Sequence, residues 1–290
     1  MEQTAFDSLV AGLRPQLHRY CARMTGSVID GEDVLQDALL KATEALPRVA
    51  GISNPAGWLF RIAHNAALDF LRRRARHEAA TADAQLATIV EQEDPMQACQ
   101  AVAASLQTFM RLPVIQRSSV ILKDVLNYSV EEVSDIIGST VPAVKSALQR
   151  GRARLHDLAQ EPDEREPFVL PESDRTRLAK YVDRFNAHDF EAIRTMLAED
   201  VQLDLVNRVQ MKGRGQVGEY FHRYAAGSRW HLIPGHVDGQ PAILVFDPND
   251  MAGLPTYFVL LEWADDSIVA IRDFLFARYA MEGAIFCMMG

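Results

Sequence analysis

Apolar residues recur at helical spacing in the first part of the chain. Between residues 30 and 46, one helical face collects the apolar residues Leu35, Ala38, Leu39, Ala42 and Leu46. The segment 47–55 contains proline and glycine and interrupts this pattern, which predicts a loop. Pro55 suits the first turn of the next helix, with Asn54 as its N-cap. We therefore expect residues 5–75 to be helical.

The helix predicted after Asn54 has one apolar side and one strongly polar side. The apolar side holds Leu59, Ile62, Ala63, Ala66 and Phe70. The polar side holds Arg61, Asn65, Asp69, Arg72 and Arg73. Residues 61–76 contain five arginines and a single acid, Asp69, and a local basic stripe of this kind attracts phosphate groups.

Residues 129–155 have the pattern of a helix-turn-helix. The first helix directs three apolar residues toward a core, Val133, Ile136 and Ile137. Gly138 permits the turn, and Thr140 can cap the second helix. Ser146 and Gln149 of the second helix can reach base edges, whereas four basic residues suit phosphates, Lys145, Arg150, Arg152 and Arg154. The competing interpretation is an amphipathic helical hairpin whose basic face is only solvated.

Beyond residue 172 the pattern changes. Residues 175–197 predict two short helices broken around His188 and Asp189, and residues 216–226 predict another helix. Runs rich in β-branched and aromatic residues predict strands at 201–206, 228–234, 241–247, 255–264 and 267–278. Helices followed by a meander of antiparallel strands are typical of an α+β domain.

The charge is distributed unevenly along the chain. Residues 1–160 hold 17 Lys and Arg and 18 Asp and Glu, whereas residues 161–290 hold 13 and 21. An acidic second half is not expected to touch DNA, so nucleic-acid binding is assigned to the basic stripes of the first half. Polar segments at 77–98 and 161–173 are interpreted as linkers. A chain of 290 residues has room for two or three domains in this arrangement.

The cysteines and the N-terminus restrict the cellular setting. Cys21, Cys99 and Cys287 lie far apart without CxxC spacing, which favours reduced thiols over disulfides or a zinc site. Residues 1–10 lack a basic start and an apolar core, and the chain has no run of eighteen apolar residues. We therefore expect a cytoplasmic protein without membrane insertion, metal or cofactor.

Two motif sets in the first 160 residues resemble the extracytoplasmic-function (ECF) group of the sigma-70 family. The first set comprises Asp30, Glu32, Asp33, Gln36, Trp58, Leu59, Arg61, Ile62, Ala63, Asn65, Asp69, Arg72 and Arg73. The second comprises Leu112, Pro113, Val144, Lys145, Ser146, Arg150, Gly151 and Arg152. The chain departs from the family at Ala143, where Thr is common, and at Ala147, where Arg is common. The resemblance implies two all-α sigma domains, residues 1–76 and residues 99–160, the second containing the helix-turn-helix.

The same resemblance implies three binding surfaces. An acidic surface would dock on the β′ clamp helices of core RNA polymerase through Asp30, Glu32, Asp33, Gln36 and Asp37. The promoter −10 element would meet Trp58, Arg61, Asn65, Arg72 and Arg73. The −35 element would meet Thr140, Ala143, Lys145, Ser146, Gln149, Arg150 and Arg152. A solvated acidic face, and a core role for Trp58 in place of base stacking, are the competing interpretations.

Residues 174–290 resemble the SnoaL-like branch of the nuclear-transport-factor-2-like superfamily. The resemblance rests on residues 181–185, 197–201 and 230–242. It implies an α+β cone, a curved antiparallel sheet wrapped by helices around a pocket, with five candidate pocket residues, Tyr181, Asp204, Trp230, His231 and Tyr257. Asp204, His231 and Asp273 are candidates for a positioned acid. Their spacing does not place them in one cavity, so structural roles compete with this assignment.

These features together predict an ECF sigma factor that binds core polymerase, recognises promoter DNA and promotes transcription initiation. It would not be an enzyme, and its fused C-terminal domain would regulate it. The alternative is a helix-turn-helix regulator fused to a small-molecule-converting SnoaL-like enzyme, and a simple helix-turn-helix repressor is a further rival. An anti-sigma factor and a small-molecule ligand stay open as additional partners, because the sequence identifies neither.

Overall fold

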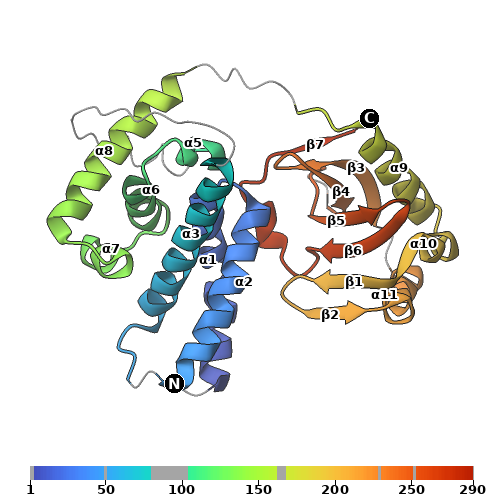
Figure 1. Cartoon of the computed structure of the whole chain (residues 1–290), viewed down its shortest axis with the longest axis horizontal. Helices are drawn as coiled ribbons and strands as arrows, with labels where there is room; N and C mark the ends of the chain where they lie inside the picture. Colours follow the sequence, from blue (N-terminus) through green and yellow to red (C-terminus); the bar gives the residue numbers. More distant parts are fainter. Residues whose placement is uncertain are drawn as a thin grey trace. The chain divides into compact units, whose positions relative to one another are not determined.

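The computed structural model describes residues 3–48, 51–79, 104–161, 168–227, 230–250 and 253–289. The chain divides into a helical unit, Met1–Glu164, and a sheet unit, Arg165–Gly290 (Figure 1). No helix in the described ranges has both the length and the apolar character needed to cross a membrane.

The helical unit begins with three long helices, α1 (Gln3–Thr25), α2 (Val28–Ala45) and α3 (Pro55–Ala79). A short 3-10 turn, η1 (Leu46–Arg48), follows α2. The Ser27 side chain caps α2 by accepting hydrogen bonds from the backbone N–H groups of Ile29 and Asp30. The predicted cap of α3 is confirmed, because Asn54 Oδ1 accepts a hydrogen bond from Gly57 N at 2.9 Å.

The second half of this unit consists of α5 (Leu106–Met110), α6 (Val114–Val120), the π-helical segment η2 (Ile121–Val125), α7 (Val130–Ile137) and α8 (Val141–Gln160). Ser129 and Glu132 form a capping box at the start of α7. Gly138 ends that helix with φ of 67°, a left-handed conformation that suits glycine. The Thr140 side chain caps α8 by accepting from Ala143 N at 3.3 Å. The predicted helix-turn-helix is therefore formed by α7 and α8.

One hydrophobic core joins both halves of the helical unit. Tyr20, Phe60 and Phe109 are fully buried in it. The rings of Phe60 in α3 and Tyr128, which follows η2, meet edge to face with centroids 5.1 Å apart. Within the helical unit, residues 3–48 and 51–79 therefore pack with residues 104–161 as a single body.

The sheet unit starts with two helices, α9 (Glu172–Asn186) and α10 (Phe190–Met196). Its strands are β1 (Leu197–Leu205), β2 (Val209–Lys212), β3 (His231–Val237), β4 (Gln240–Phe246), β5 (Tyr257–Ala264), β6 (Ser267–Asp273) and β7 (Phe286–Met288). A third helix, α11 (Arg214–Gly227), lies between β2 and β3, and a 3-10 turn, η3 (Arg278–Met281), follows β6. Helix α9 packs on β3 and β4, whereas α11 packs on β1 and β2.

The α+β fold is confirmed, and the sheet is open and mixed: it departs from the predicted antiparallel sheet in one parallel strand pair. Its strand order is β2-β1-β6-β5-β4-β3-β7. Strands β3 to β6 form the predicted antiparallel meander, but β6 pairs with β1 in parallel. The chain passes from β2, at one edge of the sheet, through α11 to β3, near the opposite edge. Three antiparallel pairings then bring β6 back beside β1, and β6 runs in the same direction as β1. Two short strands at the sheet edges, β2 and β7, were not predicted.

Candidate functional site

The exposed face of α2 carries most of the residues expected to bind polymerase. Asp33, Gln36 and Asp37 are exposed, and Asp33 and Asp37 lie one helical turn apart. Leu40 lies one turn further along the same face and is 58% exposed. Leu40 is not among the residues predicted from the sequence, although its spacing of seven residues from Asp33 indicates this face.

Glu32 lies on the opposite, buried side of α2. Its side chain is 1% exposed and forms an ion pair with Arg14 of α1. Buried Val28 and Leu35 lie four residues before and three residues after it, so the helical period could have indicated this position. In this structure Glu32 is a structural group between α1 and α2, and its carboxylate is not on the expected docking face.

The polar face of α3 carries Arg61, Asn65, Arg72 and Arg73, all exposed as predicted. Trp58 is only partly buried, and its ring packs edge to face against Phe6 with centroids 6.4 Å apart. The Trp58 ring therefore contributes to the edge of the core, which agrees with the competing interpretation of this residue.

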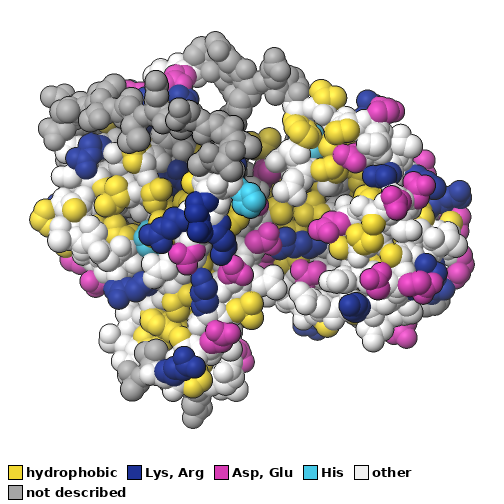
Figure 2. Space-filling view, viewed as in Figure 1, with side chains coloured by type: hydrophobic (Ala, Val, Ile, Leu, Met, Phe, Trp, Pro, Cys, Tyr) yellow, Lys and Arg dark blue, Asp and Glu magenta, His cyan; other side chains and the backbone are white. Residues whose placement is uncertain are grey.

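Ion pairs connect the acidic residues of α2 with the basic residues of α3. Asp37 Oδ2 lies 3.7 Å from an Arg73 guanidinium nitrogen, and Asp30 Oδ2 lies 3.7 Å from one of Arg74. Figure 2 shows basic and acidic side chains next to each other over these helices. Two of the acids predicted to face polymerase thus contact the arginine stripe predicted to face DNA.

Asp69 extends this set of pairs. It accepts from Arg72 in its own helix at 3.2 Å and lies 3.5 Å from Lys41 Nζ of α2. The acid that interrupts the basic stripe in the sequence therefore serves to orient its neighbours.

The second helix of the helix-turn-helix exposes Lys145, Ser146 and Arg150, and leaves Ala143 and Gln149 partly exposed. Arg152 is different, because its guanidinium forms a bidentate pair with Asp124 of η2 at 2.9 and 2.7 Å. That pair fastens α8 to the preceding segment, and the Arg152 side chain is 22% exposed. Arg152 is therefore already engaged within the chain in this structure.

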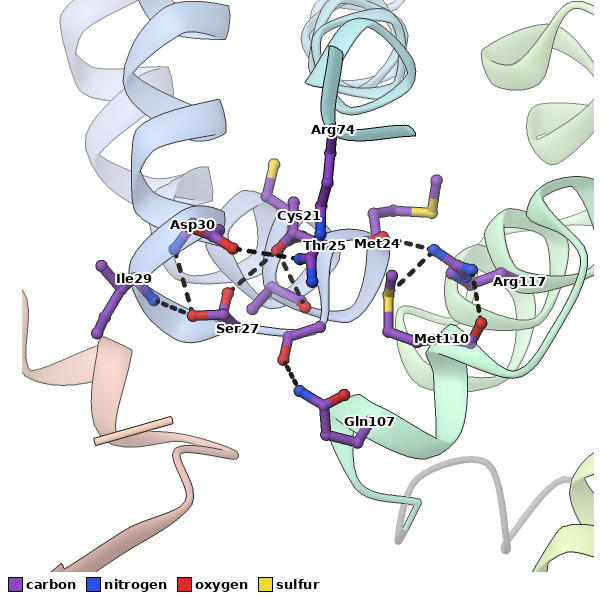
Figure 3. A network of polar contacts seen from close by, with 12 residues as sticks. Cys21, Met24, Thr25, Ser27, Ile29, Asp30, Arg74, Gln107, Met110 and Arg117 are labelled. Atoms are coloured by element: carbon purple, nitrogen blue, oxygen red, sulfur yellow. Dashed lines mark hydrogen bonds and ion pairs between the residues drawn. The ribbon is translucent and has the colours of Figure 1, made fainter. Parts of the chain in front are cut away.

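A network of polar contacts surrounds the turn between α1 and α2 (Figure 3). Gln107 Nε2 donates to Gly26 O at 2.8 Å, and Arg117 donates to Met24 O at 2.7 Å. Arg117 also donates to the carbonyl groups of Met110 and Leu112, both at 3.0 Å. Burial lowers the pKa of Arg117 to about 10. These contacts tie the first helices of each half of the helical unit together.

A groove of about 310 Å³ lies between the loop after α2 and helix α7. Asn54 lines it from the loop, Trp58 and Arg61 line it from the start of α3, and Glu132 and Asp135 line it from α7. Arg61 donates a hydrogen bond to the backbone carbonyl of Asp135. The predicted loop and the start of α3, which is expected to meet the −10 element, therefore border the first helix of the helix-turn-helix in this structure.

The candidate pocket residues of the sheet unit are only partly brought together. Trp230 and Tyr257 meet edge to face with ring centroids 5.4 Å apart, whereas Tyr181 stacks on Phe185 within α9. His231 is exposed and lies on the sheet face opposite to Tyr257, because Leu232 is the residue in register with Val245 and Tyr257.

The two candidate acids lie on opposite faces of the sheet. In the parallel register, Asp204 lies beside Arg272 and Leu205 lies beside Asp273. Asp273 is fully buried and accepts hydrogen bonds from the hydroxyl of Tyr220 and from Leu275 N. Tyr220, which was not among the predicted site residues, is thus a direct hydrogen-bond partner of this buried carboxylate.

A groove of about 790 Å³ borders α9, and it includes Arg175, Lys180 and Asp183 together with Pro234 and Met289. None of the five predicted pocket residues lines it. Within the described ranges, no three His, Cys, Asp or Glu side chains form a group that could hold a metal ion.

Two family models match the helical unit. Sigma-70 region 2 matches residues 9–77, and Sigma-70, region 4 matches residues 106–155. The chain is 28% identical over 294 residues to the ECF RNA polymerase sigma factor SigG of Mycobacterium tuberculosis, covering 90% of this chain and 79% of SigG. An alignment of that extent reaches well into the sheet unit.

Two further comparisons concern M. tuberculosis proteins. The ECF RNA polymerase sigma factor SigM is 34% identical over 154 residues, which cover 53% of this chain and 76% of SigM. The crystal structure of the extracytoplasmic-function sigma factor SigJ is similar at 19% identity and a TM-score of 0.36, covering 92% of this chain and 95% of SigJ. The two matched sigma regions and the 34% identity across three quarters of SigM show that the chain belongs to the ECF group of RNA polymerase sigma factors.

Proposed function

We propose that this chain binds core RNA polymerase through the exposed face of α2 and directs it to promoter DNA through α3 and α8. The observation that carries the proposal is the combination of surfaces in one helical unit. An acidic face lies on α2, and exposed basic residues lie on α3 and on the second helix of a helix-turn-helix. A repressor needs the second surface but not the first.

The α2 face has the chemistry of a docking surface for basic helices. Asp33 and Asp37 supply charge that steers a cationic partner, and exposed Leu40 supplies apolar area beside them. We assign the polymerase contact to Asp33, Gln36, Asp37 and Leu40, with Asp30 at the edge. Glu32 is left out because its side chain is buried against Arg14.

Promoter contacts are assigned by exposure and chemistry. Arg61, Asn65, Arg72 and Arg73 are assigned to the −10 element, where arginines meet phosphates and an amide can read a base edge. Exposed Lys145, Ser146 and Arg150, with partly exposed Gln149, are assigned to the −35 element. Binding energy from these contacts, made in the cytoplasm on polymerase, would be directed into strand separation.

We also propose that the sheet unit is a SnoaL-like regulatory domain and not an enzyme. Its candidate carboxylates, Asp204 and Asp273, lie on opposite faces of the sheet, and three strands separate His231 in β3 from Asp204 in β1, so no two of the three form an acid–base pair. Its acidic composition suits docking against basic surfaces of the same chain. Tethering supplies an effective concentration on the order of millimolar, so even weak docking would be populated.

Run-off transcription with purified core polymerase tests both proposals. The full chain should support initiation, and Asp37→Lys should reduce it by weakening the association with core. Asp7→Lys, at an exposed position of α1, is the matched control for charge alone. A chain that binds promoter DNA tightly without polymerase and does not support initiation would instead be a repressor.

A truncation after Gln160 tests the role of the sheet unit. It should change run-off transcription severalfold at matched protein concentration: activity rises if the sheet unit occludes DNA or polymerase surfaces, and falls if it holds the sigma regions in a competent spacing. Equal activity of the truncated and full-length chains at several salt concentrations would make the sheet unit a passenger. Turnover of a small molecule by the full chain would favour the fused-enzyme alternative.

A further inference from the structure

The ion pairs between α2 and α3 join two surfaces with different expected partners. Asp37 belongs to the proposed polymerase face, and Arg73 belongs to the proposed −10 face. Asp30, two turns before Asp37 in α2, pairs in the same way with Arg74, the residue after Arg73, and Figure 3 shows Arg74 reaching from α3 toward Asp30. Each acid can therefore form an ion pair with either of two cations, an arginine of its own chain or a basic residue of polymerase.

We propose that these pairs couple polymerase docking to DNA binding. When basic residues of polymerase engage Asp37 and Asp30, Arg73 and Arg74 lose an intramolecular partner and become available to DNA phosphates. In the unbound chain, the same pairs reduce the attraction of both surfaces for their partners. This inference rests on the proposed function, because it requires that the α2 face docks on polymerase.

The exposure of the pairs allows such an exchange. The Arg73 and Asp37 side chains are 53% and 51% exposed, so a partner can reach both groups without unfolding the helices. Water screens pairs of this kind, which makes them weak and readily exchanged. The Arg14–Glu32 pair differs in this respect, because both side chains are almost completely buried and cannot exchange partners in the folded chain.

The size of the coupling is limited by the strength of the pairs. An exposed pair of this kind changes an equilibrium by about two- to fivefold, so two pairs could change it by about tenfold. Coupling between two binding events is reciprocal, so DNA would strengthen polymerase binding by the same factor. The effect should weaken as salt concentration rises, because salt screens exposed charges.

The test compares two arginine variants of the full chain. Arg73→Gln removes the partner of Asp37 and should tighten binding to core polymerase about two- to fivefold at low salt. Arg72→Gln is the matched control, because it removes the same charge from the same helix but from a residue that pairs with Asp69. The difference between the two variants isolates the pair from the general effect of net charge.

A double-mutant cycle completes the experiment. Adding Arg73→Gln to Asp37→Asn should give no further gain in core affinity, because the pair is already lost. Equal core affinity of Arg73→Gln and Arg72→Gln, with unchanged thermal unfolding, would overturn the coupling. If Asp37→Asn alone leaves core affinity unchanged, the docking face itself is wrong, which distinguishes failure of the proposed function from failure of this inference.

A second experiment measures the affinity of the chain for DNA in the absence of polymerase. A non-specific duplex is the probe, since backbone contacts need no particular sequence. Asp37→Asn should bind it about two- to fivefold more tightly than Glu44→Gln, a neutralised exposed acid of the same helix. Equal affinity of these two variants would show that Arg73 is not restrained by Asp37.

Discussion

Removing the Glu32 carboxylate should destabilise the helical unit strongly without removing a polymerase contact. Glu32→Leu deletes one member of a buried ion pair and leaves the Arg14 guanidinium in a site where its side chain is 11% exposed. Loss of one partner of a buried pair costs about 3–5 kcal/mol. We take about 3 kcal/mol, because the remaining exposure lets Arg14 recover some hydration.

Urea unfolding followed by circular dichroism at 222 nm measures this cost, because the helical unit dominates that signal. With a slope of about 2 kcal/mol per molar urea, the midpoint should fall by about 1.5 M. The double variant Arg14→Met/Glu32→Leu should recover at least half of the loss, because it buries no charge.

The polymerase assay then separates structure from binding. The double variant should bind core within about twofold of the unmodified chain once its fold is restored, because neither side chain lies on the exposed face of α2. A recovered urea midpoint together with a tenfold or greater loss of core affinity would refute this reasoning and return Glu32 to the docking surface.

Three further predictions address the other parts of the helical unit. Lys145→Ala should weaken DNA binding on all sequences and reduce the salt slope by about one, whereas Ser146→Ala should change base preference; a sequence-dependent effect of Lys145→Ala would contradict the assignment. Burial lowers the pKa of His64 to about 4, so as pH falls the unfolded chain takes up this proton at a higher pH than the folded chain does. The free energy of unfolding should therefore fall by about 3 kcal/mol between pH 6.5 and pH 4. His64→Gln should make the free energy of unfolding less dependent on pH in this range. Gly151→Ala would place a Cβ 2.8 Å from Val120 Cγ2 and should cost about 1–3 kcal/mol in urea unfolding, whereas Gly12→Ala, with nothing within 4 Å, should not destabilise.

The helix caps and the turn of the helical unit could be predicted from the sequence, because each depends only on residues that are close together in the chain. Asn54 caps a backbone N–H three residues later, Thr140 does the same, and Gly138 adopts its own left-handed turn. Exposure of Asp33, Asp37 and Lys145 follows from helical period alone. These local features determine the helix-turn-helix and the two charged surfaces without any tertiary contact.

Tertiary structure decided which of these charged groups are available. Glu32 pairs with Arg14 across 18 residues, and Arg152 pairs with Asp124 across 28. No local pattern identifies such partners, because they depend on which helices pack together. For the same reason, the sequence did not show that Asp204 and Asp273 lie on opposite faces of the sheet, because this depends on the register between β1 and β6. The sequence by itself determined the kinds of surface that this chain carries, whereas long-range packing determined which side chains remain on them.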